Sequence, residues 1–244
     1  MPHLYKPGAL KVPQYEANQS PFDWTPNLPF RLCATSPSGG GKTSLCVNLL
    51  TDVYQENGRS LFDAIYLISH SVNLDASYTP VKSMIDEMET GGYYDHFDEA
   101  VVKKLFDEHV AHVAYQKKHK HKKIHQVVFY CDDIVDDPKL RYSPVLQSIL
   151  IRGRHIFCSS IFTSQQMRKV PVIARVNFSD WFIWSIHSKG ELAQLIEEHS
   201  ALVPADELYQ AYKNATDVKY GFLWVNKRDR TFHLGLGPPI EFSR

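Results

Sequence analysis

The sequence predicts an α/β fold in which a central, mostly parallel sheet is flanked by helices and a β-hairpin lies near the C-terminus. A glycine-rich loop at residues 36–43 joins a strand-like run to a helix-like run, and a second apolar run, at residues 127–131, ends in two carboxylates. Elsewhere, apolar runs of strand length alternate with helix-like segments, which is typical of parallel sheets. A length of 244 residues suits one such domain with short extensions.

The composition excludes a disordered chain and an overall polycation. Hydrophobic residues make up 43% of the chain and aromatic residues 12%, which is ample for a packed core. Lysine and arginine together number 27, and so do aspartate and glutamate. Any contact with nucleic acid must therefore come from a local basic patch.

The cysteines and the hydropathy pattern indicate the cellular compartment of the protein. Cys33, Cys131 and Cys158 lie in strand-like runs, and with Cys46 they form no C-x-x-C pair. We expect four small buried side chains in a reducing compartment. The sequence has no apolar run of about 18 residues and no signal-peptide pattern, so we expect a soluble, intracellular protein with no membrane segment of its own.

Residues 1–29 are rich in proline and show little periodicity, which predicts an extended arm in front of a domain at residues 30–244. Phe22 and Trp24 could attach this arm to its own core or to a neighbouring subunit. The sequence leaves both attachments open.

The loop SPSGGGKT at residues 36–43 has the strand-loop-helix context that a phosphate-binding P-loop requires. Its glycines let the backbone turn N–H groups onto an anion, and the start of the next helix adds partial positive charge. Lys42 would reach the β- and γ-phosphates of ATP, and the Thr43 hydroxyl would ligate Mg²⁺. The predicted nucleotide-binding residues are Ser38, Gly39, Gly40, Gly41, Lys42, Thr43 and Ser44.

One position departs from the pattern G-x-x-x-x-G-K-[ST], because Ser36 stands where the first glycine is expected. Pro37 biases Ser36 toward an extended conformation, so we expect the strand to run straight into the loop. The alternative is a glycine-rich turn that happens to precede Lys-Thr.

After the P-loop helix, residues 63–69 are predicted to form a buried strand and residues 91–94 a loop. A long amphipathic helix should follow, because apolar residues recur at three- and four-residue spacing. These residues are Phe97, Val101, Leu105, Phe106, Val110 and Val113.

The run KKHKHKK at residues 117–123 contains five lysines and no acid. One interpretation is a contact with the phosphate backbone of nucleic acid, which needs charge but no base-specific geometry. The other is a solvated helix end, where lysines suit the helix dipole. Nearby histidines raise a metal hypothesis that no cysteine or carboxylate pattern supports; they are His109, His112, His119, His121 and His125.

The apolar run before Asp132 and Asp133 should be buried on both faces of a parallel sheet, and ligands bind at the carboxyl ends of such strands. Asp132 would hold Mg²⁺, and Asp133 would orient and deprotonate the attacking water. Many such enzymes have glutamate at the second position, so Asp133 must sit closer to that water. The alternative is that Asp133, Asp136 and Asp137 only shape a turn.

The later elements are predicted in order. Residues 140–150 read as a helix that leads to Arg152 and Arg154, and residues 156–163 as a strand followed by Gln165, which could touch the γ-phosphate or its attacking water. The remaining elements are an aromatic strand at residues 181–185, a helix with Leu192, Leu195 and Ile196 on one face, and a hairpin at residues 220–225 and 231–236.

Together these motifs resemble the genome-packaging ATPases of the FtsK–HerA superfamily, in particular the poxvirus-type branch of large DNA viruses, virophages and polinton-like viruses. The resemblance rests on the P-loop, the paired acids, Arg-Gly-Arg-His before a strand ending in Thr-Ser-Gln, and Pro-x-x-x-Arg-x-Asn before an aromatic strand. It covers about residues 30–236. It implies a single RecA-like P-loop ATPase domain in a ring-forming motor that drives double-stranded DNA into a preformed capsid.

The resemblance also implies roles for residues. It makes Lys42 and Thr43 the phosphate and Mg²⁺ ligands, Asp132 and Asp133 the metal-binding and catalytic acids, and Gln165 the strand-end sensor. Arg152 or Arg154 looks like the arginine supplied to the γ-phosphate of a neighbouring subunit. For both arginines a surface ion pair or a DNA contact is the alternative.

We therefore predict an ATPase that requires ATP and Mg²⁺ and translocates double-stranded DNA as a homo-oligomeric ring. Its further partner would be a capsid protein at a portal or vertex, and its location the viral assembly site in the host and the virion. The lysine run and the hairpin around Lys227 and Arg228 are candidate DNA contacts. Two alternatives remain: another P-loop enzyme, such as a nucleoside or nucleotide kinase, and a nucleotide-gated assembly factor without useful turnover.

Overall fold

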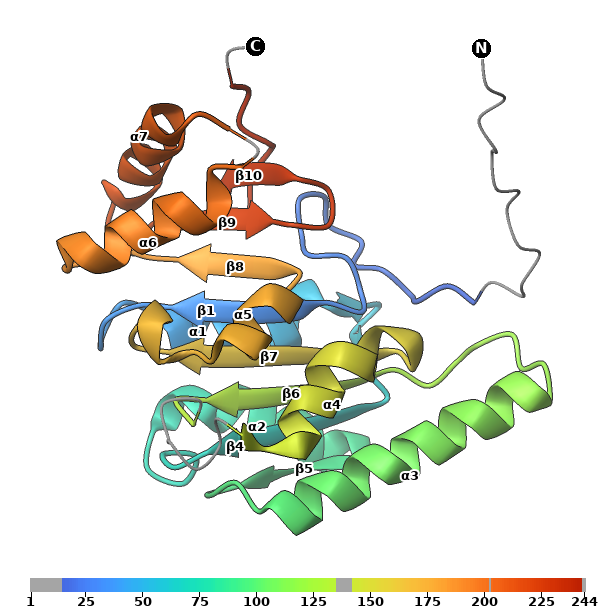
Figure 1. Ribbon diagram of the computed structural model, residues 1–244. Coiled ribbons are helices and arrows are strands. Elements are labelled where there is room, and N and C mark those ends of the chain that lie inside the picture. Colours follow the sequence, from blue (N-terminus) through green and yellow to red (C-terminus); the bar gives the residue numbers. More distant parts are fainter. Residues whose placement is uncertain (1–14, 135–141, 202, 243–244) are drawn as a thin grey trace, which may run out of the picture.

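The computed structural model of the protein describes residues 15–134, 142–201 and 203–242. Its larger sheet is built from β1 (Arg31–Thr35), β4 (Ala64–Ser69), β5 (Gly91–Tyr94), β6 (Val127–Asp132), β7 (Cys158–Ser164), β8 (Asp180–Ile183), β9 (Leu223–Asn226) and β10 (Thr231–Leu234). The spatial order of these eight strands is β10-β9-β8-β1-β7-β6-β4-β5 (Figure 1). The six strands from β8 to β5 run parallel, and β9 and β10 add an antiparallel hairpin. The predicted α/β class with a C-terminal hairpin is confirmed.

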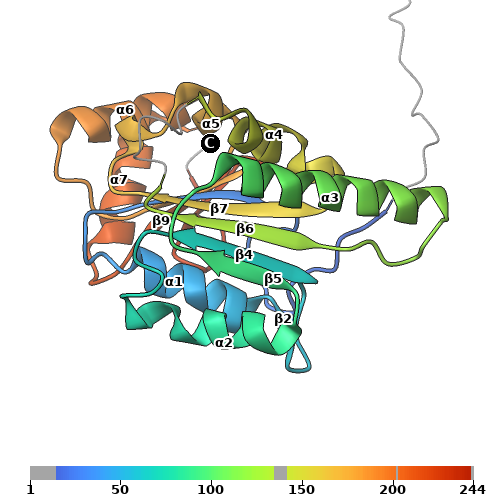
Figure 2. The ribbon, with the colours of Figure 1, turned by 90° about the horizontal axis from the view of Figure 1, so that it is seen from below.

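Helices cover both faces of this sheet (Figure 2). They are α1 (Lys42–Asn48), α2 (Thr79–Met88), α3 (Glu99–Lys118), α4 (Pro144–Arg152), α5 (Val172–Asn177), α6 (Lys189–His199) and α7 (Ala205–Thr216). The pair α1 and α2 packs on one face, and α3 to α7 pack on the other. A π-helical turn (Leu49–Val53) extends α1 and leads to the small hairpin of β2 (Gln55–Glu56) and β3 (Arg59–Ser60).

The strands read as apolar runs because they are buried on both faces. In β1, Leu32 and Ala34 belong to the core under α1 and α2, whereas Cys33 belongs to the core under the other helices. Every residue of β6 and of β7 is buried. All four cysteines are buried and none forms a disulfide, as their apolar surroundings predict.

The prediction of a loop at residues 91–94 is wrong. These residues form β5, which pairs in parallel with β4 at the edge of the sheet. Two glycines begin this strand, and a Cβ at Gly91 would lie 2.2 Å from the carbonyl oxygen of Ile65. A short, half-exposed strand of this kind is stabilised by pairing with its neighbour and contains no apolar run, so its residues carry no strand signal.

The predicted long helix is confirmed as α3, but its buried face is shifted. Val102, Phe106, His109 and Val113 are buried, whereas Val101 is exposed. His109 fills a core position because its Nε2 lies 2.6 Å from the carbonyl oxygen of Ile156. Burial lowers the pKa of His109 to about 4, so it is neutral at pH 7. A buried histidine is not apolar, so the apolar periodicity could not reveal it.

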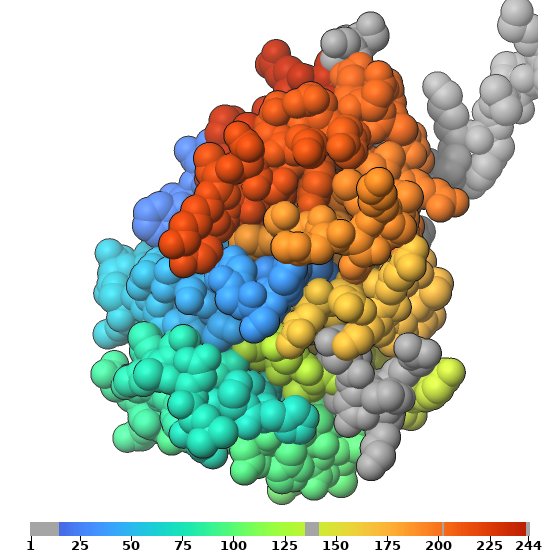
Figure 3. Space-filling model, turned by 90° about the vertical axis from the view of Figure 1, so that its left-hand side faces the viewer, coloured from blue at the N-terminus to red at the C-terminus, as the bar shows by residue number. Residues whose placement is uncertain are grey.

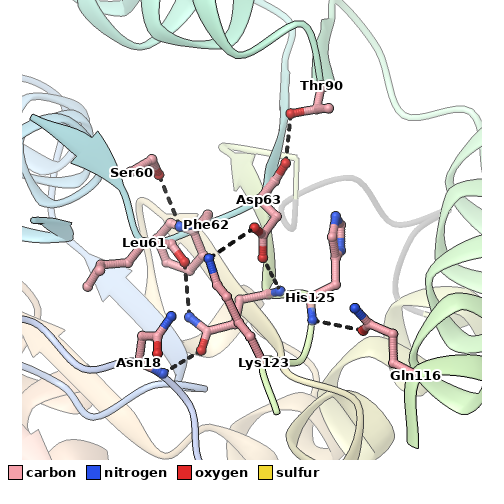
Figure 4. Close-up of polar contacts among 10 residues, drawn as sticks. Asn18, Ser60, Leu61, Phe62, Asp63, Thr90, Gln116, Lys123 and His125 are labelled. Atoms are coloured by element: carbon pink, nitrogen blue, oxygen red, sulfur yellow. Dashed lines mark hydrogen bonds and ion pairs between the residues drawn. The ribbon is translucent and has the colours of Figure 1, made fainter. Parts of the chain in front are cut away.

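The described part of the N-terminal segment, residues 15–29, lies on its own domain. The Asn18 N–H donates to Oε1 of Gln126 at 2.6 Å, and Nε2 of Gln126 donates to the Leu61 carbonyl at 3.0 Å (Figure 4). Phe22 stays exposed, and the ring of Trp24 lies 6.4 Å from that of His233, at the C-terminal hairpin. Trp24 therefore approaches its own core, and the arm of residues 1–29 as a unit stays a prediction.

Because six strands are parallel, the sheet has two different edges. The carboxyl edge is where β1, β6 and β7 end, and the amino edge is where they begin. The turn of the β9–β10 hairpin lies at the amino edge, because Asn226 at the end of β9 pairs with Asp180 at the start of β8. Within the described residues, no helix combines the length and apolar character needed to span a bilayer.

Candidate nucleotide-binding site

The glycine-rich loop leaves the carboxyl edge between β1 and α1. The Ser36 N–H donates to the Ser164 carbonyl at 3.2 Å, so the pairing of β1 with β7 continues one residue past Thr35. Gly39 and Gly41 have φ of +75° and +94°, values that favour glycine. A Cβ at Gly40 would lie 1.7 Å from the Ser36 Oγ, so a larger residue here would displace the Ser36 hydroxyl.

Lys42 is the first residue of α1 and is only 6% exposed. Its Nζ donates to the Ser36 carbonyl at 2.8 Å, and it makes no ion pair in the part of the chain that is described. A buried ammonium requires negative charge or several acceptors. The site that it lines is therefore suited to an anion such as a polyphosphate.

Asp132 ends β6, two strands away from β1, and is 3% exposed. Its carboxylate accepts hydrogen bonds from the hydroxyls of Tyr78 and Thr163, and from that of Thr43 at 3.1 Å. Burial raises the pKa of Asp132, although these hydroxyls act in the opposite direction. Thr43 and Asp132 thus place two hard oxygen ligands side by side next to the P-loop, which fits Mg²⁺.

Asp133 lies on the solvent side of Asp132 and has φ of +52°. Its N–H donates to the Thr163 Oγ1 at 2.7 Å, and Gln165 Nε2 lies 3.5 Å from its Oδ2. Thr163 therefore ties both acids to β7, the strand between them and the P-loop. The alternative turn includes Asp136 and Asp137, which lie outside the described residues.

These groups border a cleft of about 610 Å³ at the carboxyl edge. Figure 3 views this edge, with the P-loop segment in blue between the teal segment that follows β4 and the red-orange end of α7. The cleft is lined by the P-loop, Asp132, Asp133, the segment with Ser71, Asp75 and Ser77, and the aromatic residues Trp184, Tyr220 and Phe222. Gln165 borders a neighbouring hollow with Ser36, Pro37 and Ser38 instead.

The two predicted arginines lie at the edge of the sheet opposite to this cleft. Arg152 ends α4 and Arg154 lies in the following turn, both just before β7 begins at the amino edge. The guanidinium of Arg152 lies 5.9 Å from the centre of the Phe106 ring, and Nε of Arg154 donates to His155 at 3.1 Å. Neither arginine can therefore serve the nucleotide site of its own subunit.

Basic residues from several elements gather at the same amino edge. Burial lowers the pKa of Arg31, and the charges of Arg228 and Arg154 lower it further. Nζ of Lys227 and Nη2 of Arg228 donate to the carbonyls of Arg175 and Pro29. The end of α3, with the lysine run, lies at this edge as well (Figure 1).

The structure supports the interpretation of the lysine run as a solvated helix end only for some of its lysines. The helix stops at Lys118. Lys117 donates to the His155 carbonyl at 2.7 Å, and Lys123 lies 3.5 Å from Asp63 (Figure 4). Lys118, Lys120 and Lys122 are exposed. In the described ranges, no three histidine, cysteine or acidic side chains are placed to hold a metal ion.

Sequence reasoning missed three residues of this site. Tyr78 reaches Asp132 from the segment before α2, Thr163 bridges the two acids, and Tyr220 contacts the P-loop from the far end of the chain. Thr163 could have been found from its place before Gln165. For the tyrosines the sequence carries no signal. Tyr78 is separated from Asp132 by 54 positions and Tyr220 from Gly41 by more than 170, so both contacts depend on the tertiary fold.

A P-loop after β1, a buried acid at the end of β6 and a single strand between them define the P-loop ATPase fold. The chain belongs to the family described as Poxvirus A32 protein, which matches residues 23–212. This confirms the predicted kinship with the poxvirus-type viral packaging ATPases.

Solved structures agree on the fold. The genome packaging NTPase B204 from Sulfolobus turreted icosahedral virus 2, in complex with ATP-gammaS, is 16% identical with a TM-score of 0.55 over 85% of this chain and 97% of that one. B204, the DNA-packaging ATPase from Sulfolobus Turreted Icosahedral Virus, is 16% identical with a TM-score of 0.54 over 84% of this chain and 96% of that one. The cytoplasmic domain of EssC is 14% identical with a TM-score of 0.51 over 69% of this chain and 35% of that one. A comparison with curated proteins found no match.

Proposed function

We propose that the protein hydrolyses ATP with Mg²⁺ and uses the energy to move double-stranded DNA into a viral capsid as a homo-oligomeric ring. The observation that carries the ATPase part is the chain of hydroxyl contacts from Thr43 through Asp132 to Thr163. It joins the P-loop, the acid strand and the strand between them into one site. The family and the B204 structures, one of which binds ATP-gammaS, support this choice.

In this proposal, the P-loop N–H groups and Lys42 hold the phosphates. Thr43 and Asp132 hold Mg²⁺, which supplies positive charge to the phosphate oxygens when it is bound. Asp133 accepts the proton of the attacking water, and Gln165 orients the Asp133 carboxylate from the end of β7. Asp133 is better placed than Asp132 for this role, because Asp133 is exposed whereas Asp132 is only 3% exposed and is assigned to Mg²⁺.

Asp133→Asn is expected to bind Mg·ATP nearly normally and to lower kcat by roughly 10²- to 10⁴-fold, since only the proton acceptor is lost. Asp133→Glu should retain part of the activity. Asp132→Asn should instead weaken the Mg²⁺-dependent part of binding. Calorimetry with and without Mg²⁺, beside steady-state hydrolysis, separates these effects, and identical behaviour of the two asparagine variants would contradict this division of roles.

The DNA part of the proposal rests on the basic amino edge. Replacing Lys118, Lys120 and Lys122 with glutamine should leave basal hydrolysis unchanged and weaken DNA binding. The slope of log K against log salt should fall by about 0.9 for each lost phosphate contact. A matched triple variant, Lys82, Lys103 and Lys104 to glutamine, removes the same charge elsewhere and should keep the slope. An unchanged slope in the first variant would return the lysine run to a solvated surface.

Comparing hydrolysis with and without double-stranded DNA tests the function as a whole. A packaging motor should hydrolyse ATP faster when DNA is present, whereas a nucleotide kinase should respond to a small acceptor and not to DNA. A nucleotide-gated assembly factor should bind ATP and show no stimulated turnover. Either of the last two results would replace the proposed function.

A further inference from the structure

Tyr220 presents a large aromatic ring at the mouth of the cleft. It is 58% exposed, although Phe222, two residues further on, is buried. A Cβ added to Gly41 would lie 3.3 Å from Cδ1 of Tyr220, so the ring borders the last residue of the P-loop. The exposed ring and the phosphate-binding backbone thus share one wall of the cleft.

The backbone holds Tyr220 firmly in this place. Its φ is +65°, which is rare for a residue with a bulky side chain. The Tyr220 carbonyl accepts a hydrogen bond from Trp184 Nε1 at 3.0 Å, and the Gly221 N–H donates to Val218 at 2.9 Å. An exposed side chain does not require such a conformation for packing, and strained positions of this kind cluster at functional sites.

Behind Tyr220, Trp184 and Phe222 complete an aromatic wall. Their ring centres lie 4.8 Å apart and the two residues are nearly buried, which makes this wall rigid. Ser44, Leu45 and Asn48 of α1 line the same cleft. The cleft therefore combines an aromatic surface, the start of α1 and the P-loop.

We propose that Tyr220 is the platform on which the base of the bound nucleotide stacks. The inference rests on the proposed binding of a nucleoside triphosphate by the P-loop. A base linked to phosphates held at Gly41 and Lys42 must leave the loop along one of its walls, and Tyr220 is the exposed ring on that wall. Because an aromatic face accepts any base, ATP and GTP should bind with similar affinity.

The test compares ATP with inorganic tripolyphosphate, which has the phosphates but no base. With the full chain and Mg²⁺, calorimetry should show that Tyr220→Ala weakens ATP binding roughly 5- to 150-fold and leaves tripolyphosphate binding unchanged. Tyr220→Phe and Tyr220→Trp should keep the ATP affinity. The Lys219 ammonium lies 4.9 Å from the centre of the Tyr220 ring. Tyr209→Ala is the matched control, because Tyr209 is an exposed tyrosine on α7 with the Lys213 ammonium 5.9 Å from its ring centre.

Two results would overturn the inference. ATP affinity that is unchanged in Tyr220→Ala would mean that the base does not use this ring. Equal losses for ATP and tripolyphosphate would mean that the ring only supports Gly41. Failure of the proposed function looks different, because the wild-type chain would then bind neither ligand in a manner that depends on Lys42.

Discussion

Replacing Lys42 with alanine is expected to abolish measurable binding of ATP at ordinary concentrations. The ammonium is buried beside the cleft, and within the described ranges of the chain its hydrogen-bond partner is the Ser36 carbonyl. Truncating one member of a buried, hydrogen-bonded charge pair costs about 2–5 kcal/mol, which corresponds to roughly 30- to 5,000-fold in the dissociation constant. Calorimetry with Mg·ATP measures this loss, which should be accompanied by loss of hydrolysis.

Lys42→Met is the control for folding, since it keeps the apolar stem of the side chain and removes only the charge. It should bind ATP as poorly as the alanine variant and keep the thermal unfolding temperature of the wild type. Undiminished ATP affinity in either variant would mean that residues 36–43 are a glycine-rich turn and not a phosphate-binding loop.

The sequence predicted the fold best where strands are buried on both faces. The runs that became β1, β4 and β6 have no polar residue to interrupt them, so their periodicity and length were sufficient. It failed at β5, where pairing with β4 makes a strand of two glycines and two half-exposed tyrosines. The strength of the apolar signal, and not the position in the chain, decided which strands could be found.

The same distinction applies to the site. Lys42 and Thr43 could be predicted because they begin the helix after the loop that follows β1, and Asp132 and Asp133 because they lie at the end of β6. Parallel strands bring their carboxyl ends together, so the two pairs meet. Tyr78 and Tyr220 approach from loops whose path depends on the packing of α2 and α7. Their side chains carry no spacing that relates them to the P-loop, so only the three-dimensional structure brings them to it.

A shared active site is the second consequence with a large expected effect. Arg152 and Arg154 lie at the amino edge, and Lys42 lies at the carboxyl edge, so an arginine that acts on bound ATP must belong to another subunit. Contacts between two different faces of neighbouring subunits form a ring when the rotation between subunits closes. An arginine supplied in this way stabilises charge in the transition state and raises kcat by roughly 10³- to 10⁵-fold.

Arg152→Ala or Arg154→Ala should therefore bind ATP normally and hydrolyse it slowly. Lys42→Ala subunits lack a working nucleotide site but retain both arginines. Mixed with the arginine variant, they should restore some complete sites, in which the nucleotide comes from one subunit and the arginine from the other. The measurement is hydrolysis by mixed assemblies over a range of ratios, with activity that is highest in the mixture although Lys42→Ala alone is inactive and the arginine variant alone is slow.

The matched negative control is a mixture of Lys42→Ala with Asp133→Asn, because both changes damage the same half of the site and no contact can combine them. It should stay inactive at every ratio. A DNA role for Arg154, which the neighbouring charges of Arg31 and Arg228 favour, predicts a different pattern: basal hydrolysis stays normal and only the response to DNA is lost. If neither arginine variant recovers in assemblies that contain both kinds of subunit, the shared site is wrong for these residues, and the ATPase proposal then depends on the P-loop and the paired acids alone.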